Sequence, residues 1–153
     1  MIKKNFFNLK KKATKKNIKK FISHIVPCIE VVGYRQKKKG IKNLGDLCSD
    51  FGGNVKFVLG VKKKFKNQNV KNLKTNIVNY KINHSVDGNT NTVYINPFNS
   101  LLFVLNKLQK DKIKHDKDFY VFTGSSVGVT PIEGKGTYKG VIENLGSVSA
   151  QIR

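Results

Sequence analysis

Apolar residues recur at helical spacing in two stretches of the chain, and each stretch predicts a helix. The first apolar face combines positions i, i+3, i+4 and i+7: Ile18, Phe21, Ile22 and Ile25. Thr14 is a suitable N-cap for a helix over residues 14–25, and Pro27 ends it. The second apolar face is made of leucines: Leu101, Leu102, Leu105 and Leu108. Asn96 and Pro97 precede this face as cap and first helical residue.

Outside these helices, short runs rich in valine, isoleucine and aromatic residues predict strands. The expected strands are residues 28–35, 55–61, 77–82, 92–95, 119–122, 136–142 and 147–152. Asp87 and Gly88 form a hairpin dipeptide, so we expect a turn there between the strands at 77–82 and 92–95. Residues 36–53 and 62–75 are expected to be irregular. Short strands with two helices predict a β-rich α+β domain.

The composition is that of one folded domain. The 153 residues include 39% hydrophobic and 10% aromatic residues, enough to bury a core. We expect residues 1–13 to be a basic, solvated N-terminal lead and residues 14–153 to be a single domain. No apolar run approaches the length of a membrane span and no signal peptide is recognisable, which favours a cytoplasmic protein. Cys28 and Cys48 are expected to be free thiols.

The formal net charge of +21 is extreme, with 30 lysine and arginine residues against 9 acidic residues. Such a charge favours contact with nucleic acid or another anionic surface. However, only Arg35 and Arg153 are arginines, and arginine is the residue that reads bases and phosphates in bidentate geometry. Lysine together with abundant asparagine, isoleucine and phenylalanine is typical of AT-rich codons. We therefore expect no specific nucleic-acid partner, and keep a lysine-rich nucleic-acid binder as a third alternative.

Four segments, in order along the chain, resemble one enzyme family. They are residues 25–35 (IVPCIEVVGYR), residues 50–60 (DFGGNVKFVLG), residues 96–108 (NPFNSLLFVLNKL), and a closing group of residues 122–125 (FTGS), Pro131 and residues 145–149 (LGSVS). Together they resemble the 2-keto-4-pentenoate hydratases and their decarboxylase relatives, in the fumarylacetoacetate hydrolase superfamily. The resemblance covers residues 14–153 and implies the C-terminal part of that fold, a rolled mixed β-sheet with two main helices.

The resemblance implies a Mg²⁺ or Mn²⁺ ion held by three carboxylates, a Glu-x-Glu pair and a third glutamate downstream. Such an ion chelates a 2-oxo acid and stabilises its enolate as a Lewis acid. Glu30 is at the position of the third ligand, and Asp50 matches an aspartate to which we assign a catalytic role. Two further segments are implied to contact the substrate: Gly52, Gly53, Thr123, Gly124 and Ser125.

The Glu-x-Glu pair of the family has no counterpart in this sequence. Residues 1–29 contain no aspartate or glutamate, and Ile2 and Lys4 take the ligand positions when this segment is aligned with the family. A lysine ammonium has no lone pair to offer a metal. After Asp50 the family has Asn-Ala-Ser, where this chain has residues 51–53 (FGG). We therefore expect a truncated catalytic domain in which metal binding and activity are impaired.

The sequence thus predicts a hydratase-like or decarboxylase-like lyase for 2-oxo or 2-hydroxy dienoic acids from aromatic catabolism, impaired by loss of the metal pair. The alternative is a non-catalytic remnant, or a subunit that pairs with a complete homologue. The expected assembly is a homo-oligomer or such a pairing, with a small 2-oxo acid as ligand and no membrane contact.

Overall fold

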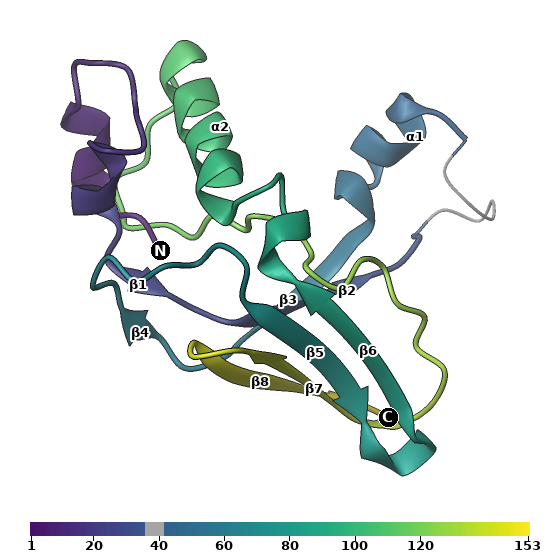
Figure 1. The fold of residues 1–153 in the computed structure, drawn as a ribbon. Helices are drawn as coiled ribbons and strands as arrows, with labels where there is room; N and C mark the ends of the chain where they lie inside the picture. Colours follow the sequence, from purple (N-terminus) through teal and green to yellow (C-terminus); the bar gives the residue numbers. More distant parts are fainter. Residues whose placement is uncertain (36–41) are drawn as a thin grey trace.

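The computed structural model describes residues 1–35 and 42–153. Its largest sheet has four antiparallel strands in the spatial order β6-β5-β7-β8 (Figure 1). These strands are β5 (Lys74–Asn79), β6 (His84–Asn89), β7 (Gly136–Ile142) and β8 (Gly146–Ile152). β5 and β6 form one hairpin, β7 and β8 form another, and the pairing of β5 with β7 joins them. The sheet is therefore completed by a contact between distant parts of the sequence.

Two smaller strand pairs adjoin this sheet. They are β2 (Cys28–Val32) with β3 (Asn54–Leu59), and β1 (His24–Ile25) with β4 (Lys63–Lys64). In the first pair Glu30 lies opposite Phe57. Every strand pairing among the described residues is antiparallel, so the structure does not reproduce the mixed sheet that we expected.

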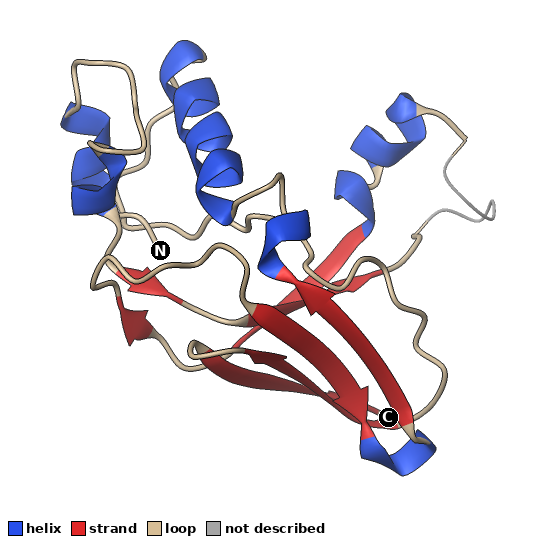
Figure 2. Ribbon diagram, in the orientation of Figure 1, coloured by secondary structure: helices blue, strands red, loops and turns tan. Residues whose placement is uncertain are grey.

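The structure has one long helix, which stands beside the N-terminal segment, where the sequence predicted two (Figure 2). The helices are α1 (Leu44–Ser49) and α2 (Pro97–Lys110), with 3-10 turns η1 (Lys4–Asn8), η2 (Ile18–Phe21), η3 (Phe51–Gly53), η4 (Tyr80–Ile82) and η5 (Thr90–Thr92). The predicted start of α2 is confirmed, because the Asn96 side chain accepts a hydrogen bond from Phe98 N at 2.9 Å. No described helix is long and apolar enough to cross a membrane.

The main hydrophobic core lies between α2 and the N-terminal segment. It unites eight buried residues: Ile2, Phe6, Ala13, Ile18, Phe21, Ile22, Leu101 and Leu105. Phe6 and Leu105 are fully buried, and the Phe6 ring meets Phe21 edge-on with centroids 5.6 Å apart. Residues 1–13 are therefore not the solvated tail that we expected, because their few apolar side chains complete this core while their lysines stay at its surface.

The helix expected over residues 14–25 is wrong. Only Ile18–Phe21 forms a 3-10 turn, and the chain then becomes extended. Ile22 forms a β-bridge with Ile2, and Ser23 N donates to Met1 O at 3.0 Å. These bonds to the N-terminal segment take the backbone groups that a continuous helix would need, while the three-residue spacing of Ile18 and Phe21 also suits a 3-10 turn.

The hairpin expected at Asp87-Gly88 is also wrong. Both residues lie within β6, and the turn that precedes β6 is η4, which is capped by Asn83 with a left-handed φ of 52°. Gly88 is used instead for close packing, because a Cβ there would lie 2.0 Å from Ser126 O. In place of the strand expected at 92–95, Thr92 ends η5 and residues 93–95 form a turn. In the strand expected at 119–122, only Phe119 makes a bridge, to Ile2.

Other predicted boundaries need smaller corrections. The strand expected at 28–35 ends at Val32, and the one expected at 77–82 is β5, which starts earlier. Within the stretch expected to be irregular, residues 44–49 form α1, and residues 36–41 lie outside the described part. The predicted loop at 62–75 contains β4 and the start of β5, whereas β7 and β8 match the prediction closely.

Candidate functional site

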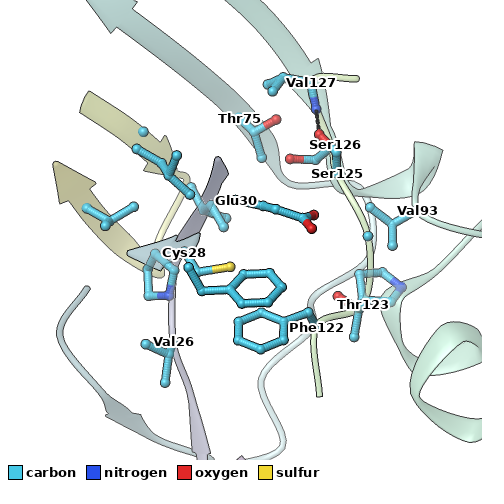
Figure 3. Close-up of a pocket in the computed structure, with 18 of the residues that line it drawn as sticks. Val26, Cys28, Glu30, Thr75, Val93, Phe122, Thr123, Ser125, Ser126 and Val127 are labelled. Atoms are coloured by element: carbon cyan, nitrogen blue, oxygen red, sulfur yellow. Dashed lines mark hydrogen bonds between the residues drawn. The ribbon is translucent and has the colours of Figure 1, made fainter. Parts of the chain in front are cut away.

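A cavity of about 350 Å³ opens between the β2–β3 pair, the four-stranded sheet and the start of α2. Its walls are mostly aliphatic and aromatic, and two of the wall rings, Phe57 and Phe122, stack face to face. The polar residues are spread along the cavity (Figure 3). Thr75 and Ser125 lie at one end, Glu30 points into the middle, and Cys28 lies toward Phe122. A small ligand with an apolar body and one polar end fits such a space.

Glu30 reaches the cavity because of strand alternation. In β2, Cys28, Glu30 and Val32 share one face, since successive side chains of a strand point to opposite faces. The Glu30 carboxylate is directed toward the segment that carries Thr123 and Ser125 (Figure 3). Its Oε1 accepts a hydrogen bond from Asn54 Nδ2 at 2.8 Å, from the first residue of β3. The neighbouring strand thus holds one carboxylate oxygen, and the Glu30 side chain stays exposed at the cavity.

The Cys28 thiol is the second titratable group on this face. Burial raises the pKa of Cys28, and the negative charge of Glu30 raises the same pKa further. A thiol with a raised pKa stays protonated at neutral pH and is a poor nucleophile. Cys28 therefore acts as a small apolar wall residue beside the carboxylate.

Residues 123–126 form the opposite wall and are fixed at both ends. Ser100 Oγ of α2 donates to Thr123 O at 2.6 Å. At the other end Asn89 N donates to Ser126 O at 3.0 Å, which brings β6 against the segment. Ser125 Oγ donates to Gly128 O at 2.7 Å and accepts from Val127 N at 3.3 Å. The expected contact residues Thr123, Gly124 and Ser125 thus all line the cavity, with the Ser125 hydroxyl bonded inside its own turn.

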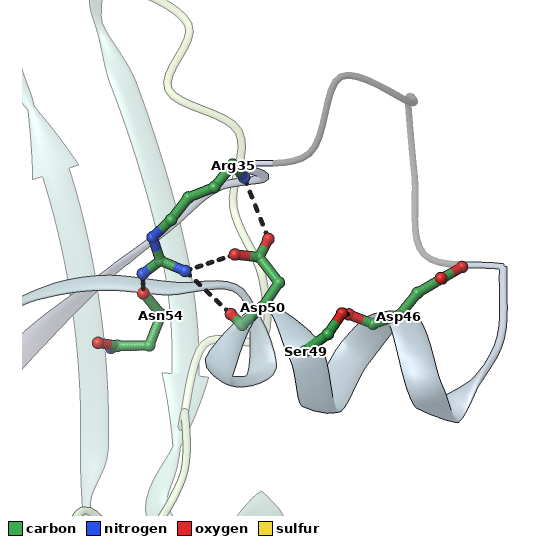
Figure 4. Close-up of polar contacts among 5 residues, drawn as sticks. All are labelled: Arg35, Asp46, Ser49, Asp50 and Asn54. Atoms are coloured by element: carbon green, nitrogen blue, oxygen red, sulfur yellow. Dashed lines mark hydrogen bonds and ion pairs between the residues drawn. The ribbon is translucent and has the colours of Figure 1, made fainter.

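Asp50, Gly52 and Gly53 lie elsewhere, at the junction of α1, η3 and β3 (Figure 4). The Asp50 carboxylate is buried and accepts from Arg35 N at 3.1 Å and from Arg35 Nη1 at 2.5 Å. These hydrogen bonds, then the guanidinium charge, lower the pKa of Asp50 against the opposing effect of burial. Gly53 N donates to Asp50 O, and Gly33 N donates to Gly53 O, each at 2.8 Å.

None of these three residues lines the cavity beside Glu30. The structure therefore brings together only part of the predicted site: Glu30 with residues 123–125. Arg35 follows β2 and bonds the Asp50 carboxylate, and its Nη2 also donates to Asn54 O at the start of β3. Asp50 and its two glycines therefore help to connect the end of β2 with the start of β3. The catalytic role assigned to Asp50 and the substrate contacts assigned to Gly52 and Gly53 stay predictions.

Two further polar residues of the cavity were not foreseen. Thr75 of β5 is only 5% exposed, and its Oγ1 has no hydrogen-bond partner among the described residues. His24 of β1 likewise lines the cavity with a buried Nδ1 that lacks such a partner. The sequence around this threonine and this histidine does not indicate that their polar atoms lack hydrogen-bond partners, because only the tertiary contacts decide whether such atoms are satisfied.

The donor set does not fit a divalent metal. Within residues 1–35 and 42–153 no three His, Cys, Asp or Glu side chains come close enough together to hold an ion. Glu30 supplies one carboxylate, the nearby thiol is protonated, and Mg²⁺ or Mn²⁺ requires several oxygen ligands. The described residues of this chain alone therefore do not form the metal site that the sequence resemblance implies.

This fold is shared by solved structures, two of which are complexes of one enzyme. 4-Oxalocrotonate decarboxylase from Pseudomonas putida G7, complexed with magnesium and adipate, matches with a TM-score of 0.76 and 18% identity over 90% of this chain and 52% of that chain. The same enzyme complexed with calcium and acetate matches with a TM-score of 0.73 and 18% identity, over 90% and 51%. This chain thus spans about half the length of these structures.

No family model matches the sequence, and no curated protein matches it. The structural likeness confirms, at the level of the fold, the resemblance to the hydratases and decarboxylases that four sequence segments predicted.

Proposed function

We propose that this chain is a 2-keto-4-pentenoate hydratase-like or decarboxylase-like protein whose cavity binds a small 2-oxo or 2-hydroxy dienoic acid. The position of Glu30 supports this proposal most directly: its carboxylate points across an apolar cavity toward residues 123–125, in a fold shared with a decarboxylase. The aliphatic and aromatic walls suit the hydrocarbon part of a dienoic acid. Residues 123–126 are fixed at both ends by hydrogen bonds from Ser100 and Asn89, and the Thr123 hydroxyl and backbone amides of this segment are the proposed donors for the ligand carboxylate.

We further propose that the described residues catalyse poorly on their own. Glu30 can accept a hydrogen bond or a proton from a ligand, and the walls exclude water from the ligand's apolar part. The Lewis-acid chemistry of the resembling family needs a chelating set of carboxylates, which these residues do not assemble. Binding without efficient turnover is the expected behaviour.

Direct binding and turnover measurements on the purified chain test this function. We expect 2-hydroxypenta-2,4-dienoate to shift the amide NMR signals of residues 28–32 and 123–126, with turnover by ultraviolet absorbance near background, with or without Mn²⁺. A Glu30→Gln variant should alter the binding, whereas Asp118→Asn, at a carboxylate that instead bonds Lys4 N, should not. Signals that stay in place at millimolar ligand would refute binding in this cavity.

A second candidate function is a subunit that pairs with a complete homologue. The end of the β2–β3 pair that leads to α1 exposes apolar side chains: Val32, Tyr34, Leu44, Phe51 and Val55. Exposed apolar residues grouped on one arm of a fold favour a protein–protein contact. Light scattering of the chain alone and mixed with a complete hydratase tests this function. We expect a mixed complex that Tyr34→Asp weakens and Phe103→Asp, at an exposed site on α2, does not.

A further inference from the structure

A second groove lies at one end of the four-stranded sheet, where β5 ends, β7 begins and β8 ends. Figure 1 shows the last residues of the chain beside the turn that joins β5 to β6. Three cations line the groove: Lys81 from η4, Lys135 just before β7 and Arg153 just after β8. These residues belong to three segments that are far apart in the sequence, so it is the tertiary fold that gathers them.

The groove keeps its positive charge. No acidic side chain of the described residues lines it, and none of its three cations forms an ion pair within that part of the chain. Glu133 is the acid nearest to Lys135 in the sequence, but its Oε2 lies 3.0 Å from His84 Nδ1. The α-carboxylate of Arg153 offsets one of the three charges, and three minus one leaves a net charge of +2. An anion in the groove therefore meets an excess of cations.

A buried side chain fixes the two lysine-bearing segments relative to each other. Asn79 is fully buried, and its Oδ1 accepts a hydrogen bond from Lys81 N at 3.1 Å while its Nδ2 donates to Lys135 O at 3.5 Å. Gly136 permits this close approach, because a Cβ there would lie 2.9 Å from Asn79 Oδ1. The backbone positions of both lysines are thus set before any ligand arrives, which lowers the entropy cost of binding.

Tyr80 adds an aromatic ring to the same groove. It directly follows the buried Asn79 but is itself 79% exposed. An exposed ring beside cations is suited to a ligand that has both a planar base and a phosphate, because the base stacks on the ring while the cations hold the phosphate. The guanidinium of Arg153 can bind two phosphate oxygens at once, and the lysine ammonium groups act as point charges.

We propose that this groove binds the phosphate group of a small ligand that also carries a planar base, such as a nucleoside monophosphate. Lys81, Lys135 and Arg153 hold the phosphate, and the base stacks on Tyr80. The site involves neither Glu30 nor residues 123–126, so it is independent of the proposed function. Lysine density alone does not carry the proposal, because the three successive exposed lysines at residues 10–12 line neither of the two cavities.

Titration of AMP, inorganic phosphate and adenosine into the full chain, followed by amide NMR shifts, tests the site. We expect AMP to shift the signals of residues 79–81, 135–137 and 151–153 and to leave those of residues 10–12 in place. AMP should bind about fivefold more tightly than inorganic phosphate, because stacking of its base adds to the phosphate contacts. Adenosine, which lacks the phosphate, should bind more weakly than AMP.

Two substitutions assign the binding to its residues. Lys135→Gln should weaken AMP binding about threefold to fivefold, the loss expected for one exposed charge contact. Tyr80→Ala should weaken AMP binding about fivefold and leave the binding of inorganic phosphate unchanged. Lys56→Gln is the matched control, because Lys56 is an exposed lysine in a strand, β3, outside the groove. An unchanged thermal unfolding curve for each variant excludes misfolding as the cause of a loss.

The contrary outcomes are equally clear. Shifts of residues 10–12 as large as those of the groove, or equal losses in Lys135→Gln and Lys56→Gln, would show non-specific attraction to the charge of the whole chain. AMP that binds no more tightly than inorganic phosphate, or that is insensitive to Tyr80→Ala, would show that no base stacks in the groove. Each of these results overturns the proposal and leaves the function proposed for the Glu30 cavity untouched.

Discussion

The backbone carbonyl of Ser126 lies directly against Gly88, where even a single added carbon has no room. A Cβ on Gly88 would lie 2.0 Å from Ser126 O and 2.8 Å from Ser126 C. The glycine therefore lets β6 approach the segment that faces Glu30, and the Asn89 N to Ser126 O hydrogen bond fixes that approach. The shape of the cavity wall depends on this contact.

Gly88→Ala should destabilise the protein and disturb the cavity. The added methyl forces β6 and residues 123–126 apart, at a cost of about 1–3 kcal/mol, typical of overpacking. Urea unfolding measures the loss, and the amide NMR signals of residues 123–126 should shift. Gly140→Ala is the control, because its Cβ would meet Ile29 at an ordinary 3.4 Å and should change stability much less. Equal effects of the two substitutions would contradict the close-approach role of Gly88.

Asp50→Asn should remove a pH-dependent part of the stability. Hydrogen bonds from Arg35 hold the pKa of Asp50 below its ordinary 3.8 in the folded chain. The carboxylate thus stabilises the fold fully above about pH 4 and loses this effect as the pH falls through the lowered pKa. At pH 7 the wild type should unfold at a higher midpoint urea concentration than Asp50→Asn, and the two midpoints should converge toward pH 2.

The control for this prediction is Asp111→Asn. Asp111 pairs with Lys107 across one turn of α2 at 2.5 Å, but the Lys107 side chain is 60% exposed. Exposed pairs of this kind contribute little, about 0.3–0.5 kcal/mol. A pH-independent difference between wild type and Asp50→Asn would show that the Arg35 contact does not hold the charged form.

Cys28 should react slowly with iodoacetamide at pH 7.5, and Cys48 should react faster. Burial and the charge of Glu30 raise the pKa of Cys28, which leaves little thiolate, whereas Cys48 is exposed. We expect a difference of about tenfold or more, read by mass spectrometry of the labelled peptides. Glu30→Gln removes one cause of the raised pKa and should accelerate Cys28 while leaving Cys48 unchanged. If Cys28 reacts with iodoacetamide at the same rate in Glu30→Gln as in the wild type, the carboxylate does not face the thiol.

Phe6→Ala should cost about 3–5 kcal/mol of unfolding free energy, the usual loss for a large aromatic side chain in a core. Phe6 is fully buried between Phe7 and Phe21, although it belongs to a lysine-rich segment. Phe103→Ala is the control, because Phe103 is 65% exposed on α2 and its removal should cost less than about 0.5 kcal/mol. Equal, small losses in a denaturant titration would show that residues 1–13 are not part of the core.

The elements that the sequence predicted well are those whose signals are local. The Asn96-Pro97 start of α2 is a cap and a first-turn proline, and both act through neighbouring backbone groups. The β7–β8 hairpin follows from apolar strands around Asn144, which adopts the positive φ of 60° that a tight turn needs. In both places local preference and tertiary packing favour the same structure.

The errors arise where a distant segment decides the structure. Asp87-Gly88 has the composition of a turn, but contact with Ser126 uses the same glycine for close packing within a strand. The apolar spacing of Ile18 and Phe21 suits a helix, but Ile2 pairs with Ile22 and draws the chain into an extended form. No local pattern reveals partners this far away along the chain.

The residues of the candidate site were likewise predicted only in part. The family resemblance placed Glu30 with residues 123–125, and the structure puts these residues around one cavity. Asp50 matched the family by position, yet Arg35 engages its carboxylate at the junction with α1. No sequence pattern identified Thr75, because a hydroxyl without a hydrogen-bond partner is a property of its surroundings in the fold.

The pairing of β5 with β7 also sets the order in which the molecule can assemble. Thr75 opposite Ile142 closes a long loop that contains α2 and residues 123–126, and loop closure costs entropy before these contacts repay it. Each hairpin can form early from neighbouring residues, whereas the cavity that lies against both hairpins is complete only after this closure. Ligand affinity should therefore be the last native property to return during refolding, after the hairpins have regained their hydrogen bonds.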